Sequence, residues 1–272
     1  MNVHRAPLGV WDSGVGGLSV LQELRALLPR EEMIYLADGR YCPYGGRTAG
    51  EIIERSLAMT QAVIDLGAKA VVIACNTATT VAITRVRAAF PTVPIIGMVP
   101  AVKPAAGATH TGRIGVLATP QTATGDVLAG LIRQYCPGVT VDTVPAPGLV
   151  DLVEAGLTSG PEVDAVLHPL LETLRARGVD TLVLGCTHYP FLREAIAEEM
   201  GPHVALIDSG AAVARRTREV LATHGLLTDA DLLGGSMSFE TTGAPEHFEE
   251  VTLRLLAMPV VSGALVAGPL AR

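Results

Sequence analysis

Short apolar runs alternate with longer amphipathic segments along most of the chain. The runs lack the polar–apolar alternation of half-exposed strands, which is typical of parallel strands that are covered on both faces. We expect strands at residues 8–11, 33–37, 70–74, 94–98, 113–118, 139–144, 181–185 and 204–207. The longer segments repeat apolar positions at helical spacing, most clearly at residues 16–28, 48–67 and 161–178. Strands that alternate with helices predict an α/β fold of parallel sheets joined by right-handed crossovers.

A stretch rich in Gly, Pro and Thr, residues 97–112, interrupts this pattern before the strand expected at 113–118. We expect a domain boundary in this stretch. On each side of it one apolar run ends in a cysteine, Cys75 in the first part and Cys186 in the second. The sequence therefore predicts two similar parallel-sheet α/β domains, each with one strand–cysteine–helix element.

Polar and reactive side chains follow several of the expected strands directly. They are Asp12, Ser13, Asp38, Cys75, Asn76, Thr77, Cys186, Thr187, His188 and Asp208. Ligands of open parallel sheets bind beyond the carboxyl ends of the strands. We therefore expect the active site there, in a cleft between the two domains.

The two thiols at strand ends carry the argument further. A helix that begins directly after a thiol offers free N–H groups and a partial positive charge, which lower the pKa of the thiol. Asn76, Thr77 and Thr187 also suit helix caps. A single buried cysteine commonly serves as a small apolar side chain, but two in matching contexts indicate chemistry. His188 stays open between a proton-transfer group and a polar loop residue bound to the backbone.

Composition narrows the classes of protein. Hydrophobic residues make up 49% and charged residues 17%, as in globular proteins without a sizeable disordered part. The net charge of −7, the 4% of aromatic residues and the lack of a basic cluster argue against nucleic-acid binding. We expect no membrane span and no signal peptide, hence a cytoplasmic protein. The four cysteines (Cys42, Cys75, Cys136 and Cys186) lack the paired spacing of a zinc site, so we expect free thiols and no metal.

Other segments give weaker signals. The glycines of "DSGVGGLS" (12–19) form neither a Walker pattern nor a full GxGxxG, and indicate a tight turn whose N–H groups face a small anion. The loop 39–48 is expected to close over a ligand as a lid or wall. Glu154 lies one helical turn from Asp151, where an acidic side chain is usually solvated.

Several reaction classes compete for the two thiols. A cysteine hydrolase would leave one thiol unexplained, a zinc site lacks ligand spacing, and a two-lobed binding protein needs no thiols. A racemase uses both, because one base removes a proton from a carbon and an acid returns a proton on the other face. Lys69 and Lys103, the only lysines, lie before a strand and in the Pro-rich connection, which disfavours a pyridoxal Schiff base. A reaction without a cofactor is therefore expected.

The segments "WDSGVGGLSV", "ADGRYCPYGGRT", "ACNTATT" and "GCTHYP" occur in this order over most of the chain. In this the chain resembles the glutamate racemases of the cofactor-independent aspartate/glutamate racemase superfamily. The resemblance implies a second domain inserted into the first, with residues 1–98 and 208–272 in one and 99–207 in the other. Cys42 departs from the family, which more often has a bulky or aliphatic residue at this position.

The resemblance also implies residue roles. Cys75 and Cys186 would be the two acid/base residues, and Asp12, His188 and Glu154 would assist them. The substrate-binding positions that it implies are Asp12, Ser13, Tyr44, Gly45, Asn76, Thr77, Thr187 and His188. With Arg40 and Arg47 as the only cations in these segments, substrate binding is expected to depend on hydroxyls, the Asn76 amide and backbone N–H groups.

The expected partner is a small molecule, glutamate, whose D-enantiomer would supply peptidoglycan synthesis. The sequence is compatible with a homodimer but does not determine the oligomeric state. Two alternatives stay open: a racemase of another small acid such as aspartate, and a non-catalytic two-lobed protein that binds amino acids.

Overall fold

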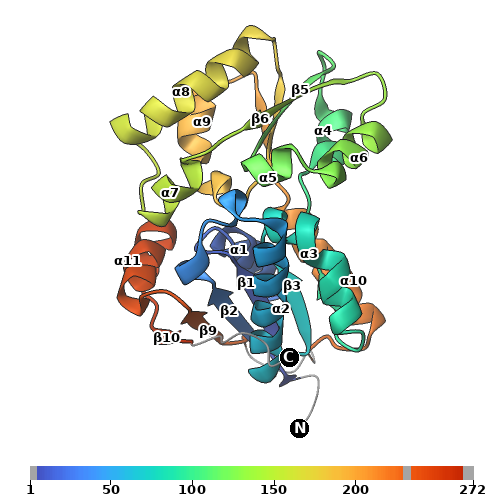
Figure 1. Cartoon of the computed structure of the whole chain (residues 1–272), viewed down its shortest axis with the longest axis vertical. Coiled ribbons are helices and arrows are strands. Elements are labelled where there is room, and N and C mark those ends of the chain that lie inside the picture. The colour runs from blue at the N-terminus through green and yellow to red at the C-terminus, as the bar shows by residue number, and fades with distance from the viewer. Residues whose placement is uncertain (1–4, 229–233, 266–272) are drawn as a thin grey trace.

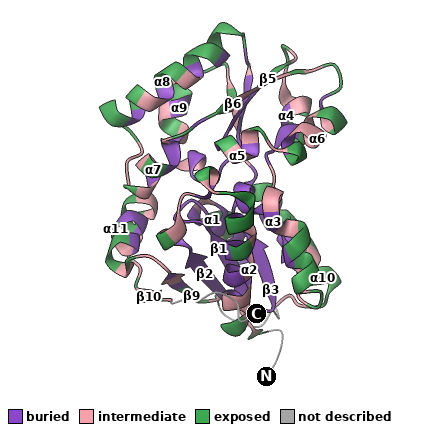
Figure 2. Cartoon of the chain, in the orientation of Figure 1, coloured by how far each residue is buried: buried purple, intermediate pink, exposed green. Residues whose placement is uncertain are grey.

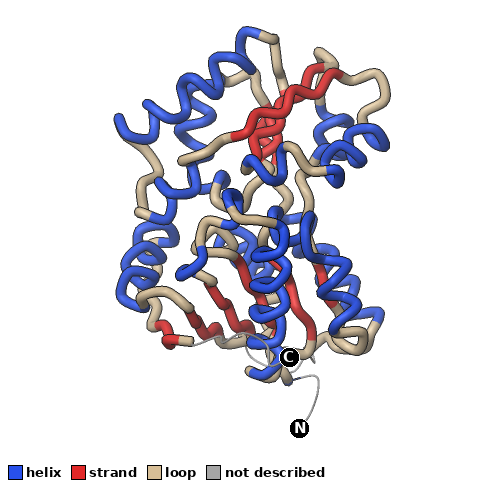
Figure 3. Tube along the Cα trace, viewed as in Figure 1, coloured by secondary structure: helices blue, strands red, loops and turns tan. Residues whose placement is uncertain are grey.

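The computed structural model describes residues 5–228 and 234–265. In Figure 1 two α/β halves lie one above the other, each built around its own parallel sheet. Figure 3 shows the strands of the lower sheet side by side and those of the upper sheet above them, with helices on the outside. The fold class predicted from the alternation of strands and helices is confirmed.

The lower half contains sheet A, with the strand order β10-β9-β2-β1-β3-β4 and parallel pairing throughout. Its strands are β1 (Leu8–Asp12), β2 (Met33–Ala37), β3 (Ala70–Ile73), β4 (Ile95–Ile96), β9 (Met237–Thr241) and β10 (Ser262–Ala264). The apolar runs predicted β1 to β4. They did not predict β9 and β10, because "MSFET" alternates polar and apolar residues and β10 is only three residues long.

The upper half contains sheet B, with the strand order β6-β5-β7-β8, again parallel. Its strands are β5 (Arg113–Ala118), β6 (Thr140–Pro145), β7 (Thr181–Leu184) and β8 (Ala205–Ile207). All of them lie within one or two residues of the ranges predicted from the apolar runs.

Helices cover both sheets. Around sheet A lie α1 (Leu18–Leu27), α2 (Ala49–Asp65), α3 (Asn76–Ala89), α10 (Gly210–Thr223) and α11 (Pro245–Leu256). The upper half has α4 (Val102–Ala108), α5 (Pro120–Ala123), α6 (Asp126–Tyr135), α7 (Leu149–Glu154), α8 (Pro161–Ala176) and α9 (Arg193–Met200). Short 3-10 turns, η2 (Gly39–Tyr41), η3 (Tyr44–Gly46) and η4 (Tyr189–Leu192), occupy loops between them.

Local sequence determines where α2 begins and where α8 begins and ends. Thr48 and Glu51 form a reciprocal capping box that starts α2. Pro161 occupies the first turn of α8, and Gly178 follows that helix with a φ of +71°, which only glycine adopts readily. The strands β1, β2, β3 and β7 are buried along their whole length, whereas the outer faces of α8 and α10 are exposed (Figure 2).

The carboxyl ends of the two sheets carry the polar residues singled out in the sequence. Asp12 ends β1, Cys75 follows β3 in sheet A, and Cys186 follows β7 in sheet B. The two thiols thus belong to different halves of the molecule. Within the described residues, no helix is both long enough and apolar enough to span a membrane.

Candidate active site

Asp12 joins the two halves at the end of β1. Its carboxylate is fully buried; Oδ1 accepts a hydrogen bond from the Ser13 N–H (2.7 Å), and Oδ2 accepts from the Gly17 N–H (2.6 Å) and the Thr187 hydroxyl (3.2 Å). Burial raises the pKa of Asp12 above its ordinary value, although the nearby His188 opposes this. A second contact between the halves runs from the Ser19 hydroxyl to the Thr187 carbonyl (2.8 Å).

Cys75 is the N-cap residue of α3. Its Sγ accepts a hydrogen bond from the Ala78 N–H (3.4 Å) and lies 3.8 Å from the Ser13 hydroxyl. The sequence predicted that the helix start would lower the pKa of this thiol. The structure shows the opposite, because burial and the neighbouring Asp12 raise the pKa of Cys75 well above its usual value, and one N–H does not compensate.

The sequence suggested Asn76 and Thr77 as caps of α3, but Cys75 itself is the N-cap residue. Asn76 is 3% exposed, and among the described residues its side-chain oxygen and nitrogen have no hydrogen-bond partner. A buried amide without a partner costs about 1–3 kcal/mol. Such a group is typical of a site that a ligand completes.

Thr77 contributes to a cluster of hydroxyls between the two halves. Its Oγ1 lies 2.9 Å from that of Thr119 and 3.3 Å from that of Thr122, both on the sheet-B side. Sequence reasoning missed Thr119 and Thr122. The signal was present, since Thr119 directly follows β5 and Pro120 starts the next helix.

Cys186 has a different environment from Cys75. Gly185 separates it from β7, and the chain continues into the 3-10 turn η4, so no α-helix starts directly after the thiol. Thr187 is therefore not a cap but a hydrogen-bond donor to Asp12. The Cys186 Sγ lies 3.6 Å from Nδ1 of His188.

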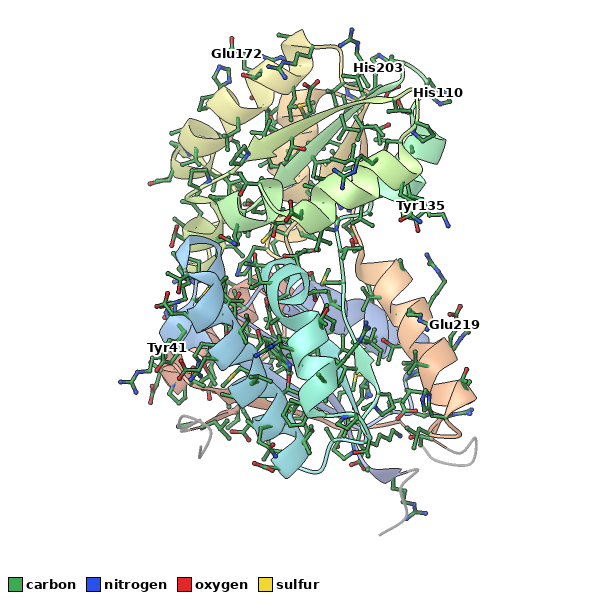
Figure 4. The ribbon with its side chains drawn as sticks, turned by 45° about the vertical axis from the view of Figure 1, so that its right-hand side comes forward. Tyr41, His110, Tyr135, Glu172, His203 and Glu219 are labelled. Carbon is green, nitrogen blue, oxygen red and sulfur yellow. The ribbon has the colours of Figure 1, made fainter. Side chains whose placement is uncertain are left out.

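His188 contacts side chains on both of its ring nitrogens, so its ring is not bound to the backbone as one of the two interpretations of the sequence had it. Its Nε2 lies 2.6 Å from Oε1 of Glu154 on α7. Burial alone would lower the pKa of His188, but hydrogen bonds with Cys186, Cys42 and Glu154 raise it well above the usual value. His110 and His203, by contrast, lie at the far end of the upper half (Figure 4).

Glu154 is not the solvated acid that its position in the sequence suggested. Its side chain is 20% exposed, and Oε1 also accepts a hydrogen bond from the Val15 N–H (2.8 Å). Burial raises the pKa of Glu154, but the hydrogen bond and the charge of His188 together with the Val15 N–H outweigh this effect, so the net shift is downward. The glycine turn therefore binds the chain's own carboxylates, Asp12 and Glu154, through these N–H groups instead of an external anion.

Tyr44 and Gly45 lie in the loop predicted to be a lid or wall. The Tyr44 hydroxyl donates to Asp38 (2.6 Å), whose carboxylate also accepts two hydrogen bonds from Arg55 (both 2.9 Å). Gly45 lies against Thr119, because an added Cβ would come within 2.9 Å of the Thr119 Cβ. The loop is thus bound to Asp38, beside sheet A, through Tyr44, and it packs on Thr119 of the other half at Gly45.

Three other basic residues and the fourth cysteine lie outside this network. Arg40 is exposed, Arg47 pairs with Glu51, and the buried Lys69 lies 2.6 Å from Glu31. Cys136 packs against the Val102 carbonyl in the upper half. Carboxylates of a ligand in this site would therefore face hydroxyls, amides and the first N–H groups of α3.

Taken along the chain of contacts, Cys75 reaches Ser13, Ser13 reaches Asp12, and Asp12 reaches Thr187, the neighbour of Cys186. One thiol lies next to a buried carboxylate, and the other lies next to a histidine that pairs with a second carboxylate. Each thiol thus has a partner that can tune proton transfer. The chain of contacts thus connects the thiol of one half to the thiol of the other.

The chain is similar in sequence and in fold to proteins of known function. The sequence model of the Asp/Glu/hydantoin racemase family matches residues 17–217. Glutamate racemase of Pseudomonas aeruginosa is 46% identical over 266 residues, which is 98% of this chain and 100% of that protein.

Two solved structures are similar over nearly their whole length. Glutamate racemase from Francisella tularensis in complex with D-glutamate has a TM-score of 0.84 and 30% identity, covering 97% of this chain and 98% of that one. Escherichia coli glutamate racemase in complex with L-glutamate and the activator UDP-MurNAc-Ala has a TM-score of 0.83 and 33% identity, covering 95% and 97%. The chain therefore belongs to the Asp/Glu/hydantoin racemase family.

Proposed function

We propose that this protein is a glutamate racemase that interconverts L- and D-glutamate with Cys75 and Cys186 as its two acid/base residues. The observation that carries the proposal is the position of the thiols, one on each half, linked through Ser13, Asp12 and Thr187. Glutamate racemases match nearly the whole chain, and two of their structures hold one glutamate enantiomer each.

In the proposed reaction, one thiolate removes the Cα proton and the electron pair moves toward the α-carboxylate. The opposite thiol then gives its proton to the other face of Cα, so the two sulfur atoms exchange protonation states in each turnover. Cys186 would take the proton from L-glutamate, and Cys75 would take it from D-glutamate. Asp12 would assist Cys75, while His188 and Glu154 would hold the charge of the Cys186 thiolate.

Binding of the substrate would use groups that the chain leaves available at this site. The Asn76 amide has no partner among the described residues, and the first N–H groups of α3 point beyond the helix. We assign Ser13, Thr77, Thr187 and His188 to the same role by their positions, with the loop at Tyr44 and Gly45 as the wall. Because both thiols are buried, glutamate must enter by movement of the segments that cover them.

We infer further that residues 1–98 and 208–272 form one domain and residues 99–207 the other. In support, β8 ends at Ile207 in sheet B, after which α10 packs on α1, and β9 and β10 join sheet A. D-Glutamate formed in the cytoplasm would supply peptidoglycan synthesis.

The first test is racemisation in deuterated water. Each enantiomer of glutamate is expected to yield the other with deuterium at Cα and with no added cofactor, because the returning proton comes from a solvent-exchanged thiol. Chiral chromatography with mass spectrometry measures both quantities, and aspartate is assayed in parallel. An inverted product without deuterium would exclude the two-base scheme, and inversion of aspartate but not glutamate would change the substrate.

A second test uses Asn76→Ala. Loss of one hydrogen bond to a charged substrate group, worth about 1.5–3 kcal/mol, is expected to raise KM roughly 10- to 100-fold. Thermal stability is expected to stay the same or rise, because the variant removes a buried amide that lacks a partner.

Thr80→Ala, on the same helix, is the matched control. The Thr80 hydroxyl bonds to the Thr77 carbonyl (3.0 Å), so its loss should leave KM unchanged. An Asn76→Ala enzyme with unchanged KM would remove Asn76 from the substrate-binding residues.

A further inference from the structure

Cys42 lies beside the His188–Glu154 pair and has no part in the proposed proton transfer. One ligand atom from each of Cys42, Glu154 and His188 lies within 4.8 Å of the other two. In residues 5–228 and 234–265, no other group of three histidine, cysteine or acidic side chains meets this spacing. Neither Cys75 nor Cys186 belongs to such a group.

The backbone holds these side chains in place. An added Cβ on Gly14 would lie 1.9 Å from Oε1 of Glu154 and 2.8 Å from Sγ of Cys42, so both side chains pack directly on the Gly14 Cα. The Val15 N–H fixes the Glu154 carboxylate from the same turn. A site formed in this way is already assembled before any ligand binds.

A cavity of about 170 Å³ adjoins two of the three side chains and is lined in part by Cys42, Asp151 and Glu154. Cys42 itself is partly exposed. A cation can therefore approach from this side, and the cavity has room for water molecules, each of which takes about 30 Å³ of liquid.

The three donors match one class of ion. A thiolate, an imidazole and a carboxylate are the side chains that bind Zn²⁺, usually in a tetrahedron. Zinc–ligand bonds of about 2.0–2.3 Å place the ligand atoms roughly 3.3–3.7 Å apart. The three ligand atoms lie within 4.8 Å of one another, so small movements would bring them to this spacing, and one of these movements opens the 2.6 Å contact between His188 and Glu154.

We propose that Cys42, Glu154 and His188 form an inhibitory site for Zn²⁺, with water from the cavity as the fourth ligand. On binding, the Cys42 thiol and the His188–Glu154 pair release their protons to solvent as the metal–ligand bonds form, and no redox change occurs. The metal then replaces the Glu154 contact at Nε2 and moves the ring, which disturbs its 3.6 Å contact with Cys186. His188 then no longer assists Cys186, a consequence that rests on the proposed function.

Binding is tested without any assay of activity. Co²⁺, a spectroscopic substitute for Zn²⁺, is titrated into the purified protein and into Cys42→Ala and Cys136→Ala. The wild type and Cys136→Ala are expected to show a thiolate-to-cobalt absorption band in the near ultraviolet that saturates at one equivalent, and Zn²⁺ should abolish it. Cys42→Ala should lack the band, and Cys42→Ser provides a second variant in case the alanine variant does not fold. A band of equal strength without Cys42 would overturn the site.

Inhibition is tested on the same proteins with glutamate as substrate. Zn²⁺ should inhibit the wild type and Cys136→Ala, with recovery on addition of a chelator, whereas Mg²⁺ should not. Relative to its own metal-free turnover, Cys42→Ala should need at least about tenfold more Zn²⁺, because one of three protein ligands is lost. Equal inhibition of Cys42→Ala would overturn the proposal. A protein that binds cobalt through Cys42 but does not racemise glutamate would instead overturn only the proposed function.

Discussion

Cys75→Ser and Cys186→Ser are each expected to lower kcat for glutamate racemisation by roughly 10²- to 10⁴-fold in both directions. A serine hydroxyl is a far weaker acid than a thiol, so it cannot carry the negative charge between turnovers. The remaining thiol cannot take over its role, because it lies on the opposite half of the molecule. Circular dichroism of the amino acid measures the initial rates. Protein circular dichroism and thermal unfolding check that the fold is intact.

Cys136→Ser is the matched control, because it makes the same change at a buried thiol that bonds only to the Val102 carbonyl among the described residues. It should retain wild-type kcat. Hydrogen exchange distinguishes the roles of the two thiols. In deuterated water, the Cys186→Ser variant should exchange the Cα proton of D-glutamate alone, and the Cys75→Ser variant should exchange that of L-glutamate alone. Near wild-type turnover in either variant would reduce that thiol to a structural role.

The alternation of apolar runs and helices was sufficient to predict both parallel sheets, because strands covered on both faces leave a continuous hydrophobic signal. It failed at β9 and β10, which have mixed polarity or are very short. β9 depends on pairing with β2, and the edge strand β10 on pairing with β9, and such long-range pairing leaves little trace in the local sequence.

The strand pattern alone could predict only those candidate site residues that lie at or just after a strand end, such as Asp12 and Cys75. Tyr44, Gly45 and Glu154 were predicted from the family resemblance. The contacts that tune the site are tertiary: Glu154 reaches the Val15 N–H across 139 residues, and Thr119 meets Thr77 across 42. Burial likewise reversed the expected pKa shift of Cys75, since a helix start can be predicted from sequence and the exclusion of water around it cannot.

Gly16→Ala is expected to lower kcat by about 10²-fold without preventing folding. The backbone of Gly16 lies outside the left-handed region, so alanine is allowed there, but its Cβ would come within 2.2 Å of Nδ1 of His188. The buried ring must then move away from Cys186 and Glu154, which hold it at 3.6 and 2.6 Å. A misplacement of about 1 Å in a catalytic group commonly has an effect of this size.

Gly130→Ala is the matched control, because its Cβ would meet only a side-chain nitrogen of Arg133 at 3.8 Å, an ordinary contact. In the middle of α6 this change should raise the free energy of unfolding by about 0.5–1 kcal/mol and leave kcat unchanged. For Gly16→Ala, kcat should fall and KM should rise as well, since His188 is assigned both to assisting Cys186 and to substrate binding. A Gly16→Ala enzyme with wild-type kcat would mean that the distance between His188 and Cys186 does not control the reaction, and the proposed role of His188 would have to be abandoned.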